Sequence, residues 1–285
     1  IDSVGGISFL NDTEYVTGEF FSPLISTIVE AKITRSGSLG TPKQILFDFQ
    51  KEFFDTLIEE QNYGSYAKIF LEHILSRDIL FFSFFDDEKE ILRGLGLSGY
   101  QDYSQTLDFS YPVFTSLSGN KSDRYIDTHY SKEVSYGENC SIETKFNITR
   151  KHLFNKKNEA EILDIFNRYD IQNRSELLQI QGKGQNHQYI RLLLPKNAQI
   201  TPQDGMILTQ HTYFQELSWY TRTEVSETTT DTIEYTLLNP LCEKYSYVHY
   251  KQPGIREYHF DITTPEYQKE FVGIRKNFIY NQRDL

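Results

Sequence analysis

Cysteine is scarce in this sequence, with only Cys140 and Cys242 among 285 residues. The two cysteines form no CxxC pair, and no histidine stands at zinc-ligand spacing to either of them, so the sequence offers no zinc-binding motif. Both precede segments with the pattern of β-strands. They are therefore either a candidate disulfide or two separate buried thiols, and the sequence leaves both alternatives open.

Long apolar runs are also missing. No segment is long enough to span a membrane as a helix, and the longest candidate, Ile79 to Phe85, has the length of a buried strand. No stretch has the pattern of a signal peptide. Because residue 1 is Ile rather than Met, we expect the chain to start inside a longer product, with any signal or membrane anchor upstream.

Positive charge is under-represented, since 29 Lys and Arg residues face 40 Asp and Glu residues and the formal net charge is −11. Nucleic-acid binding needs a basic footprint, and docking on anionic lipid needs a polybasic patch. The balance argues against both partners. The excess of acidic groups is interpreted as the solvated surface of a soluble protein.

The usual catalytic and cofactor motifs are absent as well. The sequence contains no GxSxG, no Walker loop and no dinucleotide-binding fingerprint, and its seven histidines form neither HxH nor HExxH. Asp86, Asp87 and Glu88 have the chemistry to bind a hard cation, but acidic residues also suit the first turn of a helix, which we favour. We therefore predict no catalytic, cofactor-binding or metal-binding residue, and no cofactor.

The N-terminal part of the sequence has the periodicity of helices. Apolar residues recur every three to four positions, and Ser22 with Pro23 has the pattern of an N-cap and a first helical residue. The apolar run from Ile79 to Phe85 is predicted as a buried strand. Helices that alternate with a strand indicate an α/β portion over residues 1–105. The predicted helices lie near residues 23–33, 42–60 and 65–76, and a further short helix is predicted over residues 87–95, ending near Gly94 and Gly96.

The second part of the sequence, residues 106–285, is rich in alternating strand patterns. The chain has 20 Tyr and 21 Phe, which suit sheets. Tyr245 to Ile262 alternates on both sides of Gln252-Pro253-Gly254, which predicts a hairpin. The whole pattern predicts an α+β protein whose second part is an Ig-like antiparallel β-sandwich with a helical insertion near residues 158–168. The other predicted strands are 125–134, 142–148, 189–194, 219–225 and 233–237.

The order of several short motifs resembles bacterial domain-of-unknown-function family 4012, a set of cell-envelope proteins. The similar segments are "IDSVGGISFL", "LGLSGY", "GNKSDRYIDTHY", "YIRLLLPKNAQI" and "YSYVHYKQPG", and they are spread over nearly the whole chain. Arg124 separates the Asp from the Tyr of the third motif, and Asn197 stands where the family usually has Gly. The family-like motif positions are Gly5, Gly6, Lys121, Asp123, Tyr125, Pro195, Lys251, Gln252, Pro253 and Gly254.

The N-terminal portion also resembles the C-terminal part of the LytR-CpsA-Psr fold, whose enzymes transfer glycopolymers from a lipid pyrophosphate carrier to peptidoglycan. "IDSVGGI" is similar to their Asp-x-x-Gly-Gly-Val turn, and "FDFQKEFFDTLI" is similar to the helix that carries their Arg-Gln pair. Phe49 stands at the position of that arginine, and Arg35 is the only arginine between Ile1 and Gln61. A pyrophosphate site needs several fixed cations, which this stretch does not supply.

These resemblances imply a non-enzymatic extracytoplasmic module of a bacterial cell-envelope protein, located at the cell surface. Its role would be structural, or the binding of cell-wall glycopolymer or other envelope proteins, and an upstream anchor would hold it to the membrane. Tyrosine-rich strands suit both sugar stacking and protein contacts. The alternative is a glycopolymer phosphotransferase that acts on polyprenyl-pyrophosphate-linked polymer, with its active site mostly upstream of residue 1.

Overall fold

The computed structural model describes residues 1–2, 5–9, 14–31, 44–101, 103, 107–238, 244–255 and 257–282. Over these residues the chain is an α+β protein with six α-helices, two six-stranded sheets and one two-stranded sheet. It forms two compact units, each built from separate segments of the chain. The helical unit comprises Ile1–Leu71, Gly119–Tyr125 and Leu153–Gln185, and the sandwich unit comprises Glu72–Ser118, Ile126–His152 and Asn186–Leu285.

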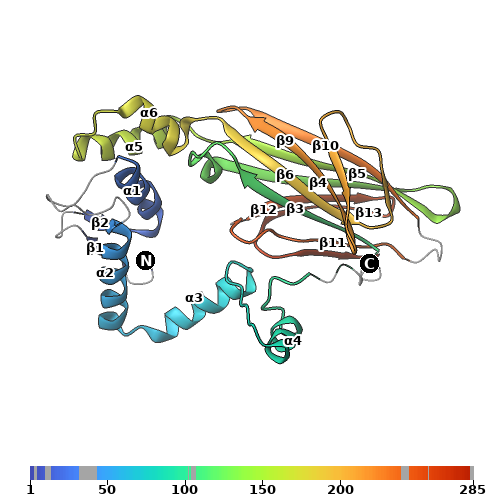
Figure 1. The fold of residues 1–285 in the computed structure, drawn as a ribbon, viewed down its shortest axis with the longest axis horizontal. Helices are drawn as coiled ribbons and strands as arrows, with labels where there is room; N and C mark the ends of the chain where they lie inside the picture. Colours follow the sequence, from blue (N-terminus) through green and yellow to red (C-terminus); the bar gives the residue numbers. More distant parts are fainter. Residues whose placement is uncertain are drawn as a thin grey trace. The chain divides into compact units, whose positions relative to one another are not determined.

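The first helices and strands of the helical unit pack around an apolar core. The antiparallel strands β1 and β2 pack against α2, and α1 lies beside α5 (Figure 1). The buried residues of this core are Ile7, Phe9, Val16, Leu24, Ile25, Ile28, Ile45, Phe49 and Ile165. The elements are β1 (Ile7–Phe9), β2 (Glu14–Val16), α1 (Gly18–Glu30), α2 (Gln44–Glu60), the first part of α3 (Tyr63–Leu75), α5 (Lys156–Arg168), α6 (Arg174–Leu178) and a π-helix, Gln179–Lys183.

Helix α1 begins earlier than the sequence predicts. Thr17 is the N-cap, and its side chain accepts a hydrogen bond from the Phe20 amide at 3.3 Å. This bond satisfies one of the free amides at the helix start. Pro23 lies inside the helix, so the prediction of Ser22 as N-cap is wrong. The Ser22 hydroxyl instead accepts a hydrogen bond from the Arg124 guanidinium at 2.5 Å.

The helical insertion α5 belongs to the helical unit, so the units do not follow the predicted division at residues 105 and 106. Asn155 and Asn158 form a capping box at its start. Ile162, Ile165 and Phe166 are buried along one face of the helix. Ile165 joins the core formed by α1 and α2, because the apolar stripe of α5 finds its partners there rather than on a sheet.

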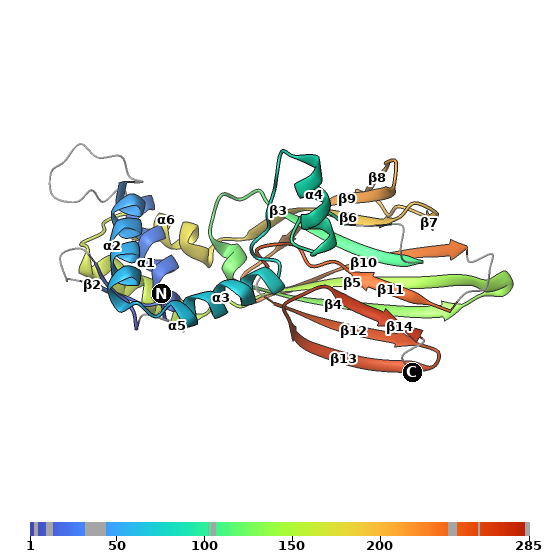
Figure 2. The same cartoon turned by 90° about the horizontal axis from the view of Figure 1, so that it is seen from below.

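The sandwich unit consists of two sheets packed face to face (Figures 1 and 2). The first sheet has the strand order β13-β12-β4-β5-β10-β7, and the second has the order β14-β11-β3-β6-β9-β8. Inward side chains from both sheets form one continuous core. The elements are α4 (Asp86–Gly94), β3 (Asp108–Ser116), β4 (Ile126–Tyr136), β5 (Ser141–His152), β6 (Asn186–Pro195), β7 (Ala198–Ile200), β8 (Ile207–Gln210), β9 (Phe214–Thr223), β10 (Thr228–Leu238), β11 (Ser246–His249), β12 (Tyr258–Thr264), β13 (Tyr267–Ile274) and β14 (Phe278–Asn281).

Each large sheet is mixed rather than antiparallel as predicted. Strand β11 pairs in parallel with β3, and β12 pairs in parallel with β4. The predicted hairpin over Tyr245 to Ile262 is wrong for the same reason. Its two strands exist as β11 and β12, but they lie in different sheets, and the turn at Pro253-Gly254 lies in the crossover between them.

The aromatic residues of this crossover face the core. Tyr245, Tyr247, Tyr258, Phe260 and Ile262 are each at most 1% exposed. Strand alternation predicts that each run presents one row of apolar side chains, and the structure buries both rows. Because the two runs belong to opposite sheets, their rows meet across the sandwich rather than side by side within one sheet.

The predicted buried strand from Ile79 to Phe85 is wrong. This segment forms no strand, and the side chains of Phe82, Phe84 and Phe85 are 76%, 85% and 69% exposed. An apolar run without alternation does not by itself distinguish a strand from an irregular segment. The segment leads into α4, whose first turn is acidic, in agreement with the helix-start role favoured for the residues from Asp86.

Candidate functional site

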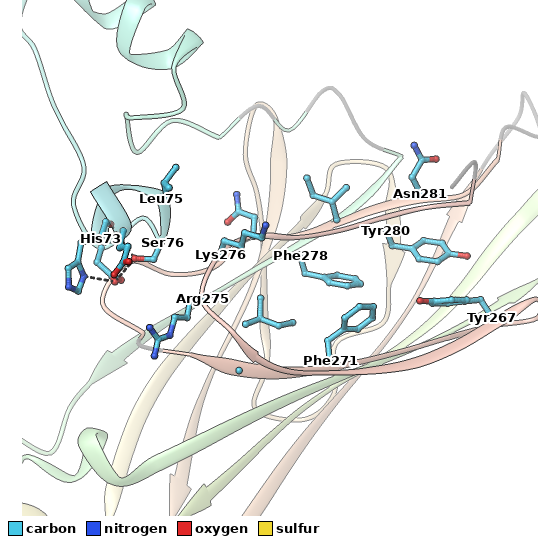
Figure 3. A pocket seen from close by; sticks show the side chains of 16 residues that line it. His73, Leu75, Ser76, Tyr267, Phe271, Arg275, Lys276, Phe278, Tyr280 and Asn281 are labelled. Carbon is cyan, nitrogen blue, oxygen red and sulfur yellow. Dashed lines mark hydrogen bonds and ion pairs between the residues drawn. The ribbon is translucent and has the colours of Figure 1, made fainter. Parts of the chain in front are cut away.

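The edge strands of the two sheets, β13 and β14, border a cleft in the sandwich unit. Each is the terminal strand of its sheet. The cleft between them has a volume of about 1030 Å³ and is also lined by the loop that joins the strands and by the end of α3 (Figure 3). This volume lies at the upper end of the range for small-molecule pockets, so it can accommodate a ligand of several rings.

Alternation along the two strands turns aromatic side chains into the cleft. Phe278 and Tyr280 are 7% and 6% exposed, whereas Ile279 between them is 70% exposed. The ring centroids of Phe271 and Phe278 are 4.8 Å apart, and those of Tyr267 and Tyr280 are 5.6 Å apart. Figure 3 shows each pair facing across the cleft from the two strands. The cleft therefore has an aromatic floor that continues the core.

Polar side chains gather around Asp78 at one end of the cleft. Lys251 Nζ donates to Asp78 Oδ1 at 2.9 Å, and Ser76 Oγ donates to Asp78 Oδ2 at 2.7 Å. His73 Nδ1 lies 3.2 Å from the same Oδ2. Burial by itself raises the pKa of Asp78, but hydrogen bonds from Lys251, Ser76 and His73 outweigh burial and lower the pKa. The Asp78 carboxylate is therefore charged at neutral pH.

The loop between β13 and β14 brings cationic and amide groups to the cleft. Arg275, Lys276 and Asn277 all line it. The loop is held in place by two hydrogen bonds, from the Tyr258 hydroxyl to the Lys276 carbonyl at 2.9 Å and from the Lys251 amide to Asn277 Oδ1 at 2.9 Å. An aromatic floor with hydrogen-bonding groups beside it suits ligands that have both apolar faces and polar edges.

A second polar cluster lies between the sheets of the sandwich. Asp108 begins β3 in the second sheet, Lys132 lies on β4 in the first sheet, and both side chains are 0% exposed. Lys132 Nζ is 2.8 Å from Asp108 Oδ2. Tyr235 OH donates to Asp108 Oδ1 at 2.9 Å, and Tyr245 OH donates to Oδ2 at 2.6 Å. Both carboxylate oxygens are thus hydrogen-bonded, as a buried charge requires.

Burial shifts the pKa of several groups in this cluster. It lowers the pKa of Lys132, against the opposing effect of the neighbouring carboxylate. It raises the pKa of Tyr235 and Tyr245 well above the usual value, so both hydroxyls remain protonated donors. His249 Nδ1 lies 2.7 Å from Ser110 Oγ, and burial together with the Lys132 charge lowers the pKa of His249. Its imidazole is therefore neutral.

Neither the cleft nor the buried cluster was predicted from the sequence. The burial of Lys132 could have been predicted, because it lies on the same face of an alternating strand as the apolar residues Tyr130 and Val134. Its pairing with Asp108 could not, since the two residues meet only when the sheets pack. The cleft residues of β14 had little signal either, because a four-residue strand is too short to establish a period.

The motif glycines of the helical unit have a backbone role. Gly5 and Gly6 have φ of 77° and 110°, a region that favours glycine. A Cβ atom on Gly6 would lie 2.5 Å from the Tyr15 ring. Phe49, at the position where the resemblance implies an arginine, is 6% exposed and packs in the apolar core, 5.2 Å from Phe9 between ring centroids.

The motif around residues 121–125 packs against other segments of the helical unit. Lys121 Nζ lies 3.3 Å from Glu30 Oε1. Asp123 is exposed. The Tyr125 ring covers Gly182, whose φ is 131°. These contacts indicate a structural role for Lys121 and Tyr125.

The motif residues of the sandwich unit also have structural partners. The Gln252 side-chain amide donates to the Phe114 carbonyl at 3.2 Å and accepts from the Phe114 amide at 2.7 Å, so it prolongs the backbone pairing of β3. Gly254 has a φ of 87°, as the turn after Pro253 requires. The Pro195 carbonyl accepts a hydrogen bond from the Gln215 side-chain amide at 2.9 Å. Among the motif positions, Lys251 is the one that reaches the polar end of the cleft, through its bond to the Asp78 carboxylate.

The described residues were also compared with the predictions on metal binding, membrane-spanning helices and the candidate disulfide. Among the residues that the structure describes, no group of three or more His, Cys, Asp and Glu side chains could hold a metal ion. Over the same part of the chain, no helix is long and apolar enough to cross a membrane. Cys140 ends the short turn before β5 and is disulfide-bonded, whereas its predicted partner Cys242 lies outside the described residues.

No protein-family model matches the chain, and no curated protein matches its sequence. Among solved structures, the chain is similar to that of a candidate nutrient-binding protein from Legionella pneumophila, with 9% sequence identity and a TM-score of 0.31. The similarity covers 61% of this chain and 66% of that one, which is less than two thirds of its length. At this TM-score the similarity supports no conclusion about fold or function here.

Proposed function

We propose that this chain is a carbohydrate-binding module of a bacterial cell-envelope protein, and that the cleft between β13 and β14 binds cell-wall glycopolymer. The observation that carries the proposal is the aromatic floor formed by the Phe271–Phe278 and Tyr267–Tyr280 pairs. Sugar rings have apolar C–H faces, which pack on aromatic rings, and hydroxyl edges, which need hydrogen-bonding groups. Arg275, Lys276 and Asn281 line the same cleft and supply such groups.

We further propose that the protein lies at the cell surface, that its sandwich unit is Ig-like, and that its helical unit is LytR-CpsA-Psr-like. The order of the motifs supports membership of family 4012 and an extracytoplasmic place at the cell surface. Two sheets packed face to face support an Ig-like sandwich, although each sheet contains one parallel pair. The similarity of the "IDSVGGI" turn supports a LytR-CpsA-Psr-like helical unit. Phe49 in the apolar core supports binding without glycopolymer transfer, because an arginine is expected there in the enzymes.

Calorimetric titration of the purified chain with soluble oligosaccharides from cell-wall glycopolymer tests the proposed function. We expect saturable binding that Tyr267→Ala weakens about tenfold, equivalent to ~1.4 kcal/mol, as for an aromatic anchor in a binding site. Tyr213→Ala is the matched control, because Tyr213 is 75% exposed and does not line the cleft. The control variant should bind as the wild type does.

Three results would contradict the proposal. The first is no saturable binding to any glycopolymer fragment, and the second is equal loss of affinity in the Tyr267 and Tyr213 variants. The third is magnesium-dependent binding of a polyprenyl pyrophosphate, which would favour the transferase alternative. Binding of another envelope protein without binding of sugar would assign the same cleft to protein contacts instead.

A further inference from the structure

We propose that Lys132 and Asp108 condense into an intramolecular amide bond that covalently joins the two sheets of the sandwich. The amine and the carboxyl group come from opposite sheets, β4 and β3. Their atoms Nζ and Oδ2 are 2.8 Å apart, and both side chains are 0% exposed. This modification is independent of the cleft and of any ligand bound there.

The packing holds the two reacting groups in contact and away from water. Tyr235 and Tyr245 fix the carboxyl group through both of its oxygens. The Tyr247 ring lies 4.3 Å from Lys132 Nζ and limits the space available to the amine. Groups held in this way react with effective molarities of about 10⁵–10⁸ M, which overcomes the unfavourable condensation of a free amine and acid in water. Exclusion of water also protects the product from hydrolysis.

Condensation requires the uncharged forms of both groups. In a site without water, a charged pair is costly, so transfer of one proton from Nζ to Oδ2 along their hydrogen bond gives a neutral amine and a neutral acid. Burial lowers the pKa of Lys132, which favours the amine. Tyr235 and Tyr245 remain donors throughout, because burial raises the pKa of both hydroxyls.

The reaction balances without an oxidant or any added reagent. The Nζ lone pair attacks the Asp108 carboxyl carbon, and the negative charge that develops on Oδ1 is stabilised by the Tyr235 hydroxyl. The carbon–Oδ2 bond then breaks. Oδ2 leaves as water with the proton it already carries and a second proton that passes directly from Nζ, which lies 2.8 Å from Oδ2. One C–N bond forms, one C–O bond breaks, and one water molecule is released.

The Lys251–Asp78 pair provides an internal comparison. Lys251 Nζ is also close to a carboxylate oxygen, at 2.9 Å, but the Asp78 side chain is 26% exposed. Ser76 and His73 hold the other oxygen as an anion. Water and a stabilised carboxylate both oppose condensation, so we expect this pair to remain an ion pair.

Intact mass spectrometry of the reduced, denatured full chain tests the proposal. We expect the wild type to be lighter than its sequence by the mass of one water molecule. Lys132→Met should have its full calculated mass, whereas Lys251→Met should still show the loss. Digestion of the wild type with trypsin should yield a branched peptide that joins residues 94–121 to residues 125–145, with Lys132 uncleaved.

The wild-type measurements decide the question even if a variant fails to fold. A wild-type mass equal to the calculated value would show that Lys132 and Asp108 form only an ion pair, and would overturn the proposal. A mass loss that persists in Lys132→Met, or a branched peptide that lacks Asp108, would also overturn it. The branched peptide together with the loss of one water would establish the bond.

Discussion

Lys251 places a charged group where no water reaches it, and the polar end of the cleft depends on how that charge is neutralised. Its side chain is 0% exposed, and its ammonium group donates to the Asp78 carboxylate and to the Ser76 carbonyl, at 2.9 and 3.1 Å. Asp78 is the more exposed partner. Removal of either residue therefore leaves a different group without its partner, and the two changes should not cost the same stability.

We predict that Asp78→Ala destabilises the chain by about 3 kcal/mol, because it leaves a buried ammonium group without a counter-ion. Lys251→Met should cost only about 1 kcal/mol, since the methionine fills the same space and Asp78 keeps Ser76, His73 and solvent as partners. Denaturant unfolding of the three proteins at pH 7 measures both values. A larger loss for Lys251→Met would contradict this account.

The same pair should make stability depend on pH. The folded-state pKa of Asp78 is lowered, so its contribution is fully present above the unfolded value of about 3.9 and is lost as pH falls through the folded value. The difference in unfolding free energy between wild type and Asp78→Ala should therefore shrink between pH 5 and the acid limit of folding. A difference that stays constant over this range would show that Asp78 is not held as a charged partner.

Sequence reasoning at the scale of residues could identify inward positions but not their partners. The parity of Tyr130, Lys132 and Val134 marks Lys132 as a charged residue on a buried face. The pairing of Lys132 with the Asp108 carboxylate follows only from the packing of one sheet on the other. Lys251 is a motif position that the resemblance singled out, but its bond to Asp78 joins two segments that are far apart in the chain.

The π-helix Gln179–Lys183 packs against the turn Ser122–Tyr125, and Gly182 lies under the Tyr125 ring. Gly182 has a φ of 131°, and a Cβ atom there would collide with the Tyr125 ring. We expect Gly182→Ala to destabilise the helical unit by about 2–4 kcal/mol, through backbone strain and overpacking together. Thermal or denaturant unfolding measures the change.

Gly64→Ala is the matched control for this prediction. Gly64 lies in α3, and a Cβ atom there meets nothing within 4 Å. Alanine in an open helical position should stabilise the chain by roughly 0.5–1 kcal/mol. If the two substitutions changed stability in the same direction, the close contact between Gly182 and Tyr125 would be refuted.

The sequence could predict the existence of most elements because their periodicity is local. The strands around Ile126–Tyr136 and Ser141–His152 alternate over ten or more residues, and the structure contains both. Sheet membership is not a local property, which is why the turn at Pro253-Gly254 suggested a hairpin although its strands lie in opposite sheets. The prediction of a strand from Ile79 to Phe85 was wrong for another reason. An apolar run without periodicity does not indicate which secondary structure the segment forms.

At the scale of the whole molecule, the sequence indicated an α+β protein with a strand-rich second part, and the structure has this class. The interleaving of the two units could not be predicted. Gly119–Tyr125 and Leu153–Gln185 are flanked by strands of the sandwich, yet they belong to the helical unit. Their assignment depends on apolar contacts such as that of Ile165, which join segments far apart in the chain.

The cleft exists because each sheet ends in an edge strand on the same side of the sandwich, so the candidate site is a property of the two sheets together. Neither β13 nor β14 would form it alone. Both strands turn aromatic residues into the space between them. We propose that this edge of the sandwich, rather than the opposite edge formed by β7 and β8, binds cell-wall glycopolymer.

Amide hydrogen exchange of the chain, with and without a saturating soluble fragment of cell-wall glycopolymer, distinguishes the two edges of the sandwich. We expect slower exchange in residues 267–281 when the oligosaccharide is present, and unchanged exchange in β7 and β8. Protection confined to β7 and β8, protection of the helical unit only, or unchanged exchange throughout at saturating oligosaccharide would contradict the proposal.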